Sequence, residues 1–498
     1  MSNASEQRFS SRWALLLSVL GIAVGTGNIW RFPRIAAQNG GDDGAGAFLF
    51  AWLVFLLVWS VPLIIAEYAL GQRGRQGVVG TFAKLAGERF AWMGAFVGFV
   101  ATAIMFYYAV VAGWCFYYTT ESLLAGLPLT TESAMTAWDG FQSSGWPLVF
   151  HAAAMVFGAL ACWQGVRSIE RVNRVLVPTL LVIVVLAVVR ALTLPGSGAG
   201  LAYLFTPEWS QLSQPRLWLE ALTQNAWDTG AGWGLILTYA AYMKREHGVV
   251  RNAFLTGIGN NTVSILAATM IFGTVFAVLG AEMSRGEILD VMRTSGPAST
   301  GLTFIWMPQL FAQMAFGKAL AVLFFLALSF AALSSLISMI ELASRALVDF
   351  GLPRTRAVGT VAGVGFVLGV PSALNLNFFA NQDFVWGVAL MISGAFVAFA
   401  VIRHGAARLR SELATPEDWR LHPAWDGMIR YLIPLEAVVL LVWWLGLAAT
   451  VYAPDTWYNP LDPFSPMTCL VQWAVALGCF VALNRWMARR TLGEVSSE

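Results

Sequence analysis

The stretch of sequence that decides the fold is Gly21-Ile-Ala-Val-Gly-Thr-Gly-Asn28, which interrupts the first apolar segment of the chain. A second stretch, Asp228-Thr-Gly-Ala-Gly-Trp-Gly234, interrupts a later apolar segment in the same way. Each glycine inside a helix costs about 1 kcal/mol relative to alanine. Two interpretations fit these glycines: close packing of helices through small residues, or helices that are broken within a membrane.

The composition around these stretches is that of a helical membrane protein. The 498 residues are 58% hydrophobic and 12% charged, and an ordinary soluble protein carries about twice that charged fraction. Lipid forces backbone polar groups to pair within helices. Apolar segments of roughly 20 residues predict twelve spans, near residues 13–37, 47–72, 91–124, 146–164, 172–193, 217–244, 249–281, 317–350, 357–376, 383–404, 431–452 and 465–487.

The connecting loops alternate between basic and acidic. One set carries most of the arginines, among them Arg73, Arg75, Arg167, Arg171 and Arg403. The other set is acidic and includes Asp42, Asp43, Glu132, Asp455 and Asp462. Because cytoplasmic loops hold the excess of Lys and Arg, we expect a bacterial inner-membrane protein with both termini in the cytoplasm. No basic cluster indicates nucleic-acid binding.

The positions of the two interruptions favour broken helices. They fall in the first and sixth of twelve spans, which are corresponding places in two halves of five helices. That pattern predicts an all-α transporter with a 5+5 inverted repeat and a site at the membrane midplane. We expect one transmembrane domain over 1–498, with repeats at about 13–193 and 217–404 and two peripheral helices at about 431–487. Unwound backbone would offer carbonyls to a cation, and helix N-termini would offer amides to an anion.

Other segments carry less information. Segment 282–316 is long and of mixed polarity, and we expect an extracellular loop with short helices that could serve as a lid. The four cysteines have no metal-ligand spacing and are expected to be buried small residues. The polar N-terminus shows no cleavage site, so no removable signal peptide is expected.

The residues around both interruptions resemble the neurotransmitter:sodium symporter family, especially its bacterial amino-acid transporters. The string Gly25-Thr-Gly-Asn-Ile-Trp-Arg-Phe-Pro33, followed by Gln38-Asn-Gly-Gly41, is similar to the family's first-helix signature. Pro62 to Glu67 resembles its second helix, Tyr107-Tyr108 its third, Gly234 to Tyr242 its sixth and Ala331 to Ser335 its eighth. The resemblance covers spans one to ten well and the last two loosely. It implies a leucine-transporter fold and sodium-coupled symport.

The resemblance implies two sodium sites built from oxygen atoms, the ligands that hard cations prefer. The first would use the substrate carboxylate with Ala23, Asn28, Asp228 and Asn260. The second would use the carbonyls of Gly21, Val24 and Ala331 and the hydroxyls of Ser334 and Ser335. An alternative for the two serines is a hydrogen bond back to their own helix.

By the same resemblance, the substrate would lie between the two unwound segments. Its carboxylate would meet the amides of Thr26 and Gly27 and the hydroxyl of Tyr108. The other implied pocket residues are Ile22, Ala23, Ile104, Trp227, Gly230, Trp233, Ser335 and Met339. The family's monoamine carriers have an aspartate where this chain has Gly25, which favours a substrate with its own carboxylate. We therefore expect a small amino acid or a related zwitterion.

Gates on both sides of the site also follow from the resemblance. Arg31 and Asp383 match the outer ion pair, with Tyr108 and Trp227 as the aromatic lid beneath it. On the cytoplasmic side Tyr242 and Asp349 match the inner network, and Arg8 is the expected cationic partner. An alternative for Arg31 and Asp383 is a plain interfacial ion pair of little energetic weight.

Asp228 is the most informative departure from the family, which usually has a serine or threonine there. An ionisable side chain within a span costs about 2.5–3.5 kcal/mol and usually marks an ion or proton path; the alternative is a cap at the helix break. Ser264 is the residue typical of chloride-dependent members and Gln224 is retained, but Trp52 replaces a tyrosine among the chloride ligands. We expect Asp228 to supply the negative charge near the first sodium, so that chloride is not required. Proton antiport on the return step is a corollary.

Two further departures concern helix geometry. Glu67 is a second carboxylate within a span, and we expect it to bind backbone groups freed by the breaks rather than to relay protons. Ser168 replaces a glycine often found ten residues before Pro178, so unwinding of the fifth helix is left open.

The leading function is therefore a secondary symporter that carries a zwitterion with two sodium ions and no requirement for chloride, as a monomer or loose homodimer. A non-transporting solute sensor on the same scaffold is the alternative, although retention of both gates argues against it. A membrane enzyme is disfavoured because the four histidines (His151, His247, His404 and His422) are scattered and no catalytic constellation occurs.

Overall fold

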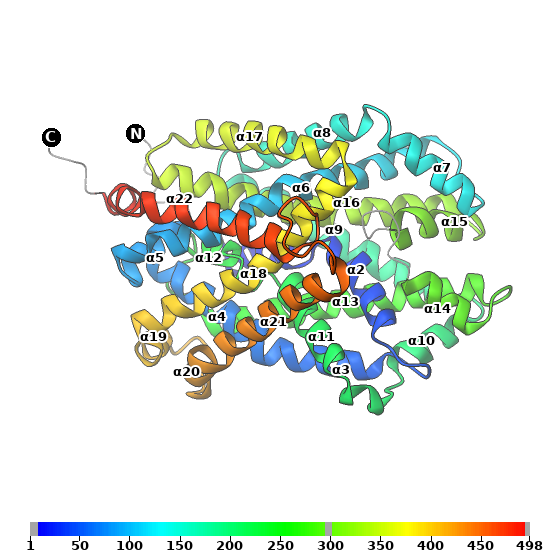
Figure 1. Cartoon of the computed structure of the whole chain (residues 1–498), viewed down its shortest axis with the longest axis horizontal. Coiled ribbons are helices and arrows are strands. Elements are labelled where there is room, and N and C mark those ends of the chain that lie inside the picture. Colours follow the sequence, from blue (N-terminus) through cyan, green and yellow to red (C-terminus); the bar gives the residue numbers. More distant parts are fainter. Residues whose placement is uncertain (1–7, 294–300, 494–498) are drawn as a thin grey trace.

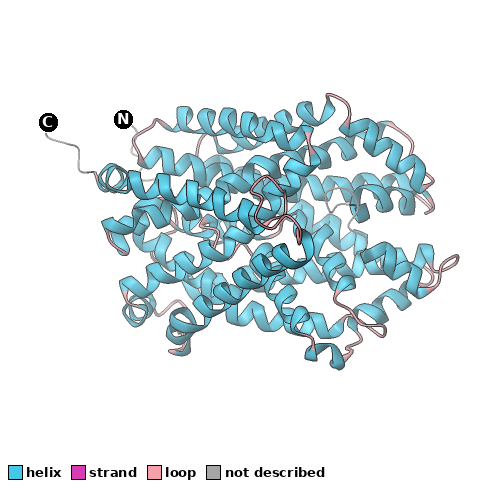
Figure 2. Ribbon diagram, in the orientation of Figure 1, coloured by secondary structure: helices cyan, strands magenta, loops and turns pink. Residues whose placement is uncertain are grey.

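The computed structural model describes residues 8–293 and 301–493, and every regular element in those ranges is helical (Figure 2). The described chain begins and ends at one end of the molecule, at the left of Figure 1, which we call the terminal end. Three short helices also lie there: α5 (Val78–Leu85), α19 (Ala406–Leu413) and α20 (Ala424–Gly427). At the opposite end lie α7 (Thr131–Gln142), α10 (Ser197–Phe205), α14 (Arg285–Arg293) and α15 (Met307–Ala312).

Nine helical segments of the described chain are long and apolar enough to cross a bilayer. They include α6 (Ala91–Leu124), α9 (Val166–Leu192), α13 (Val249–Leu279), α16 (Gly317–Asp349), α17 (Arg354–Leu374), α18 (Leu376–His404) and α22 (Pro466–Leu492), with two composite segments, Gly46–Gly74 and Ala424–Tyr452. The first composite contains α3 (Gly46–Phe55) and α4 (Val61–Gly74), and the second contains α21 (Ile433–Leu447). All nine coincide with predicted spans.

Three other predicted spans are interrupted or short. The pair α1 (Arg12–Ala23) and α2 (Thr26–Gln38) is bent by 47°, and α7 with α8 (Trp146–Cys162) by 70°. Counting each bent pair as one span gives eleven. The predicted span 217–244 is divided into α11 (Pro215–Asp228) and α12 (Leu235–Ala240). Twelve helical regions are therefore present where twelve were predicted, and the exact number that cross the membrane stays a prediction.

The first break follows from the residues between α1 and α2. Val24 leaves the helical region with φ −79° and ψ 86°, and Gly25 is extended with φ −104° and ψ −172°. The Gly25 amide donates to Oδ1 of Asn28, 2.9 Å away. A side chain at the third helical position that binds the capping residue in this way marks a helix start. Asn28 therefore stabilises the start of α2, which begins at Thr26 within the span.

The second break, residues 229–234, is set by glycine chemistry. Gly230, Gly232 and Gly234 have φ values of 70°, 87° and 78°, a left-handed region that glycine enters without steric cost. A Cβ on Gly232 would also lie 2.8 Å from the Cα of Gly394 in α18. These glycines therefore break the helix and permit close packing at once, so the two interpretations of the sequence are both correct here.

Glu67 of α4 holds the second break in place. Its carboxylate is fully buried, and it accepts hydrogen bonds from the amides of Gly232 at 2.6 Å and Leu237 at 3.0 Å. The predicted role of Glu67 is thus confirmed for the sixth span, whereas none of its hydrogen bonds in the described chain reaches the first break. Backbone amides that the break leaves without helical partners are satisfied by this carboxylate.

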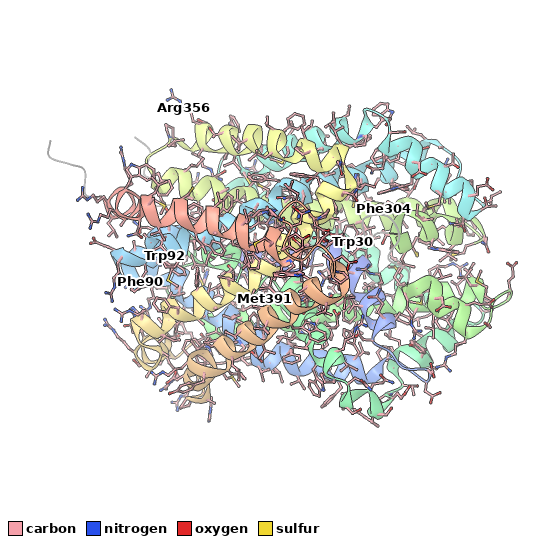
Figure 3. The ribbon with its side chains drawn as sticks, viewed as in Figure 1. Trp30, Phe90, Trp92, Phe304, Arg356 and Met391 are labelled. Atoms are coloured by element: carbon pink, nitrogen blue, oxygen red, sulfur yellow. The ribbon has the colours of Figure 1, made fainter. Side chains whose placement is uncertain are left out.

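Pairs of aromatic rings pack between helices on both halves of the bundle. Trp30 of α2 meets Phe304 edge-on with ring centroids 6.1 Å apart on the side opposite the terminal end, and Figure 3 labels both. Phe90 and Trp92 lie nearer the terminal end in Figure 3 and contact Phe399 and Phe396 of α18 at 5.0 and 5.4 Å. The expected loop 282–316 contains α14 and α15; its residues 294–300 lie outside the described chain.

Candidate functional site

A cavity of about 1010 Å³ lies between the two broken helices and α6, α16 and α18. It reaches from Ile22 and Ser335, beside the breaks, to Asn377 at the start of α18 and Phe464 just before α22. Met391, labelled in Figure 3, forms part of its wall. The cavity therefore opens toward the end opposite the chain termini.

Nearly all the predicted pocket residues line this cavity. They are Ile22, Ala23, Thr26, Gly27, Tyr108, Trp227, Gly230, Trp233, Ser335 and Met339. Ile104 is the exception, because it is fully buried in packing behind the wall. The Tyr108 hydroxyl lies 3.4 Å from the Thr26 amide and 3.3 Å from its Oγ1, which is where the family resemblance puts a substrate carboxylate.

Several oxygen atoms of the predicted first sodium site converge. Oδ1 of Asn260 accepts from Nδ2 of Asn28 at 2.7 Å. The same Asn260 atom lies 2.9 Å from the Ala23 carbonyl oxygen and 3.0 Å from the Asp228 carbonyl oxygen. Exchanging the oxygen and nitrogen of the Asn260 amide would let its NH₂ group donate to both carbonyl oxygens. It would also place that NH₂ group 2.7 Å from the NH₂ group of Asn28. With Oδ1 in this place, three oxygens face one another, and a hard cation is the partner that such a set fits.

The Asp228 side chain lies beside this set in a buried position. Its Oδ2 is 3.4 Å from both Nε2 of Gln224 and Oγ of Ser264. Its Oδ1 has no hydrogen-bond partner among the described residues. A buried carboxylate with weak partners is stabilised either by a positive charge nearby or by taking up a proton. Trp52, the residue that replaces the family tyrosine, packs its ring 4.5 Å from Phe32 and has no hydrogen bond from its indole N–H in the described chain.

The predicted second sodium site lies at the contact between α1 and α16. Oγ of Ser335 is 3.4 Å from the Gly21 carbonyl oxygen and 3.3 Å from that of Ile22, and Oγ of Ser334 is 3.0 Å from the Ala331 carbonyl. A Cβ on Gly21 would lie 3.2 Å from Cβ of Ser334. Ser334 bonds back to its own helix, the alternative left open by the sequence, while Ser335 reaches across to α1. Val24 is buried at the break next to these groups.

The outer gate residues line the cavity without closing it. Arg31 and Asp383 both belong to the wall, yet they form none of the ion pairs within 4.0 Å in the described chain. The Arg31 guanidinium instead lies 4.9 Å from the Trp227 ring centroid, and Trp227 meets Trp233 edge-on at 5.6 Å. An open outer gate agrees with the direction in which the cavity opens.

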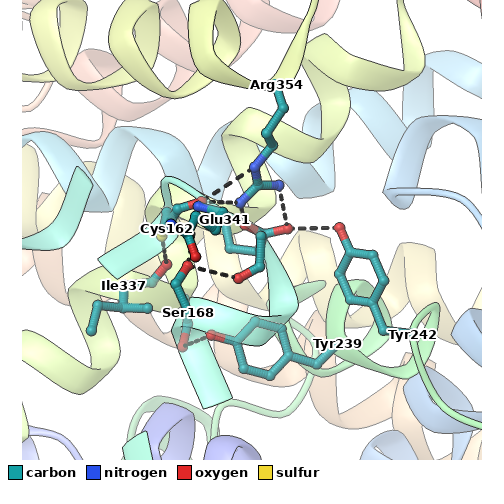
Figure 4. Close-up of polar contacts among 10 residues, drawn as sticks. Cys162, Ser168, Tyr239, Tyr242, Ile337, Glu341 and Arg354 are labelled. Atoms are coloured by element: carbon teal, nitrogen blue, oxygen red, sulfur yellow. Dashed lines mark hydrogen bonds and ion pairs between the residues drawn. The ribbon is translucent and has the colours of Figure 1, made fainter. Parts of the chain in front are cut away.

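The terminal end is closed by two linked networks that include the predicted Tyr242 and Asp349. Figure 4 shows the first: Glu341 of α16 accepts from the Tyr242 hydroxyl at 2.7 Å and from both terminal nitrogens of Arg354. In the second, Asp349 accepts from Nε of Arg345 at 2.8 Å and from the Gly77 amide at 2.6 Å.

The partner expected for Asp349 needs correction. Arg8 is exposed and forms no ion pair with Asp349 in the described chain. Arg345 takes that place, because it lies one helical turn earlier on the same face of α16. Its guanidinium also stacks on Tyr242, 5.1 Å from the ring centroid. The neighbouring Phe9 is buried and donates its amide to the Tyr242 carbonyl at 3.3 Å.

Three functional positions were missed from the sequence. Glu341 and Arg354 had a detectable signal, a carboxylate within the eighth span and an arginine just after the turn that follows it. Gly387 had none: it is a single glycine in an apolar span. A Cβ there would lie 2.4 Å from Cζ2 of Trp227, so Gly387 makes room for the aromatic lid.

Comparisons with known proteins agree with this geometry. Residues 6–144 and 139–492 match the model of the sodium:neurotransmitter symporter family. An uncharacterized sodium-dependent transporter of Methanocaldococcus jannaschii is 30% identical over 89% of this chain and 91% of its own length. The human sodium- and chloride-dependent taurine transporter is 25% identical over 96% of this chain and 82% of its own. The crystal structure of MhsT in complex with L-phenylalanine superposes with a TM-score of 0.76 at 28% identity, covering 88% of this chain and 99% of MhsT.

Proposed function

The chain belongs to the sodium:neurotransmitter symporter family, and from that premise we propose that it imports a small amino acid or related zwitterion together with sodium by alternating access. Its curated relatives in an archaeon and in Bacillus subtilis are sodium-dependent transporters. The chain is accordingly a multi-pass membrane transporter. Substrate class, number of sodium ions and chloride requirement are the parts that need experiment.

One observation carries the alternating-access proposal. The central cavity opens toward one end of the molecule, while the Glu341 and Asp349 networks close the other. A carrier needs a site that is open to one side at a time, and a bundle with a closed terminal end and an open opposite end is one of its two states.

The surroundings of Gly25 support a substrate that brings its own carboxylate. A Cβ at Gly25 would lie 3.1 Å from Oγ of Ser335 and 3.3 Å from the Tyr108 hydroxyl, so an acidic side chain there would have to displace these two hydroxyls. The Thr26 amide at the N-terminus of α2 faces the same space, and helix N-termini attract anions. The L-phenylalanine of the MhsT structure and the taurine carried by the human relative are both zwitterions.

Asp228 is proposed to make chloride unnecessary. Its carboxylate contacts Gln224 and Ser264, two of the positions that by resemblance would hold chloride. The backbone carbonyl of Asp228 is also one of the three oxygens of the first sodium site. A fixed negative charge here balances sodium without a second ion. Protonation of Asp228 after sodium leaves would provide proton antiport.

Two sodium ions are proposed, one at each oxygen cluster. We also propose one domain with repeats at 13–193 and 217–404, a monomer or loose homodimer, and a bacterial inner membrane with the terminal end in the cytoplasm. Arginines concentrate in the loops of that end, as cytoplasmic loops require.

The sodium proposal is tested with reconstituted protein. A panel of amino acids, taurine and betaine-like compounds is screened for thermal stabilisation in NaCl against KCl, because a ligand that binds only the folded state raises its stability. Counterflow in proteoliposomes then separates a carrier from a sensor, since only a carrier exchanges labelled for unlabelled substrate. Ser334→Ala with Ser335→Ala should abolish sodium-driven uptake; uptake that still followed the sodium gradient would disprove the second site.

The chloride proposal is tested by replacing chloride with gluconate. Wild type should transport equally well in both, and Asp228→Thr should lose uptake in gluconate and recover part of it in chloride. A wild-type requirement for external chloride that Asp228→Thr leaves unchanged would refute the role of Asp228.

A further inference from the structure

Three buried polar side chains lie one helical turn from the second sodium cluster, toward the terminal end. They are Ser18 on α1, Asn173 on α9 and Ser338 on α16, and all three have no exposed surface. Neither amide atom of Asn173 has a hydrogen-bond partner in the described chain, and Oγ of Ser18 has none either. Buried polar atoms in native proteins are nearly always satisfied, so these exceptions require a reason.

Helix geometry brings Ser18 and Asn173 to the same level. A Cβ on Gly21 would lie 3.1 Å from Cγ2 of Val177, so these two positions of α1 and α9 touch. Ser18 precedes Gly21 by three residues and Asn173 precedes Val177 by four, and such neighbours share a helix face.

The two helices also run in the same direction. Ser10, at the start of α1, hydrogen-bonds the Glu170 carboxylate near the start of α9, while Gly21 meets Val177 further along both. Ser18 and Asn173 therefore lie between these two contacts, facing the seam between α1 and α9.

Ser338 reaches the same level from the third helix. It follows Ser334 by one turn of α16, and its Oγ lies 3.1 Å from the Ser334 carbonyl oxygen and 3.1 Å from the Tyr239 hydroxyl. Ser334 itself adjoins Gly21. The group thus continues the oxygen atoms of the second sodium cluster toward the terminal end.

We propose that Ser18, Asn173 and Ser338 form a transient site for a partly hydrated sodium ion that leaves the second sodium cluster toward the terminal end. The inference rests on the proposed function, because it requires that cluster to hold sodium. Hydroxyl and amide oxygens are ligands that a hard cation accepts. The Glu170 carboxylate lies one turn beyond Asn173 on the same route, where it pairs with Arg174 at 2.5 Å and accepts from the Ser10 amide at 2.9 Å.

α9 supplies few backbone ligands along such a route. It is helical from Val166 through Pro178, and the Ser168 hydroxyl donates back to the Gly165 carbonyl at 3.0 Å. Most carbonyls of α9 are engaged in its own helical hydrogen bonds, but Pro178 has no N–H and leaves the Arg174 carbonyl without its helical partner. Side-chain oxygens at the level of Asn173 add to this one carbonyl the further ligands that an ion leaving the second cluster needs.

The test compares an apolar and a polar substitution of Asn173 in the full-length protein. Asn173→Leu removes the polar atoms at similar volume, and Asn173→Ser keeps a hydroxyl. Influx of ²²Na⁺ into proteoliposomes is driven by an external mixture of the twenty standard amino acids and taurine. Sodium affinity is measured separately as the NaCl concentration for half-maximal thermal stabilisation. Ser18→Ala is a second variant in case Asn173→Leu does not fold.

Asn173→Leu should slow influx at least about tenfold, the factor that corresponds to losing one polar contact to a charged group. The sodium concentration for its half-maximal stabilisation should stay within about twofold of the wild-type value. Asn173→Ser should restore influx, and Ser18→Ala should slow it. Equal influx in wild type and Asn173→Leu would overturn the inference, as would a loss of sodium affinity that matches the loss of influx. Wild-type protein without driven influx would refute the proposed function, and the inference with it.

Discussion

The Glu341 network permits a prediction whose size follows from its geometry. Glu341→Gln keeps the shape of the side chain and removes the charge that Arg354 and Tyr242 bind. Removing one partner of a buried ion pair typically costs about 3–5 kcal/mol. The Glu341 side chain has no exposed surface, but that of Arg354 is 20% exposed and regains some hydration. We therefore expect Glu341→Gln to cost about 2–3 kcal/mol, at or below the lower end of that range.

That loss should favour opening of the terminal end. Glu341 fixes the Tyr242 side chain, and the Tyr242 carbonyl accepts the Phe9 amide at 3.3 Å. Exchange of a protected amide follows the free energy of the opening that exposes it. A change of about 2–3 kcal/mol corresponds to about 30- to 150-fold. Glu341→Gln should therefore accelerate deuterium uptake at residues 8–12 by that factor.

The measurement is hydrogen exchange with mass spectrometry on protein in nanodiscs without sodium. Glu246→Gln is the matched control, because the exposed Glu246 side chain pairs with Lys244 and exposed pairs contribute about 0–1 kcal/mol. Exchange in Glu341→Gln within about twofold of wild type and of the control would refute the reasoning that this network holds the terminal end closed.

Three further changes test the breaks and the lid. Gly232→Ala forces φ 87° on an L-residue and a Cβ to 2.8 Å from Gly394, so the melting temperature should fall, by an amount corresponding to at least about 1–2 kcal/mol; Gly286→Ala, in open space on α14, is the control. Glu67→Gln leaves one of two amides without its acceptor and should destabilise the protein by about 1–3 kcal/mol at unchanged chloride dependence; wild-type stability in a thermal melt would contradict this role. Gly387→Ala should displace Trp227, so the rise in melting temperature that substrate and sodium produce should shrink by more than the melting temperature of the free protein falls. A larger fall for the free protein would instead show that the substitution only destabilises the fold.

The sequence predicts the broken helices well because their causes are local. Three glycines that adopt positive φ, and an asparagine three residues after Gly25, act within one turn of chain. The role of Glu67 was predictable for a related reason, since a carboxylate inside a span must find donors and the nearby break offers them. By contrast, the partner of Asp349 depends on how the segment before α1 packs. The sequence offers both Arg8 and Arg345, and only the coordinates distinguish them.

Pocket shape was less accessible to prediction. Ile104 lies behind the cavity wall although the resemblance assigned it to the pocket, because a small rotation of α6 decides which side chains face the cavity. Gly387 is informative only through its distance from Trp227. The separation of Arg31 from Asp383 belongs to one conformational state, and a sequence encodes all states at once.

The left-handed glycines of the second break have a consequence for how tightly a solute can be held. Because Gly230, Gly232 and Gly234 impose the unwound path through their own torsion angles, the binding segment is already in its final form before any solute arrives. The entropy of unwinding is lost during biogenesis, when the chain folds, and does not recur in each transport cycle. Binding then avoids the cost of ordering this segment, and solutes of different shape can be exchanged without remaking the backbone.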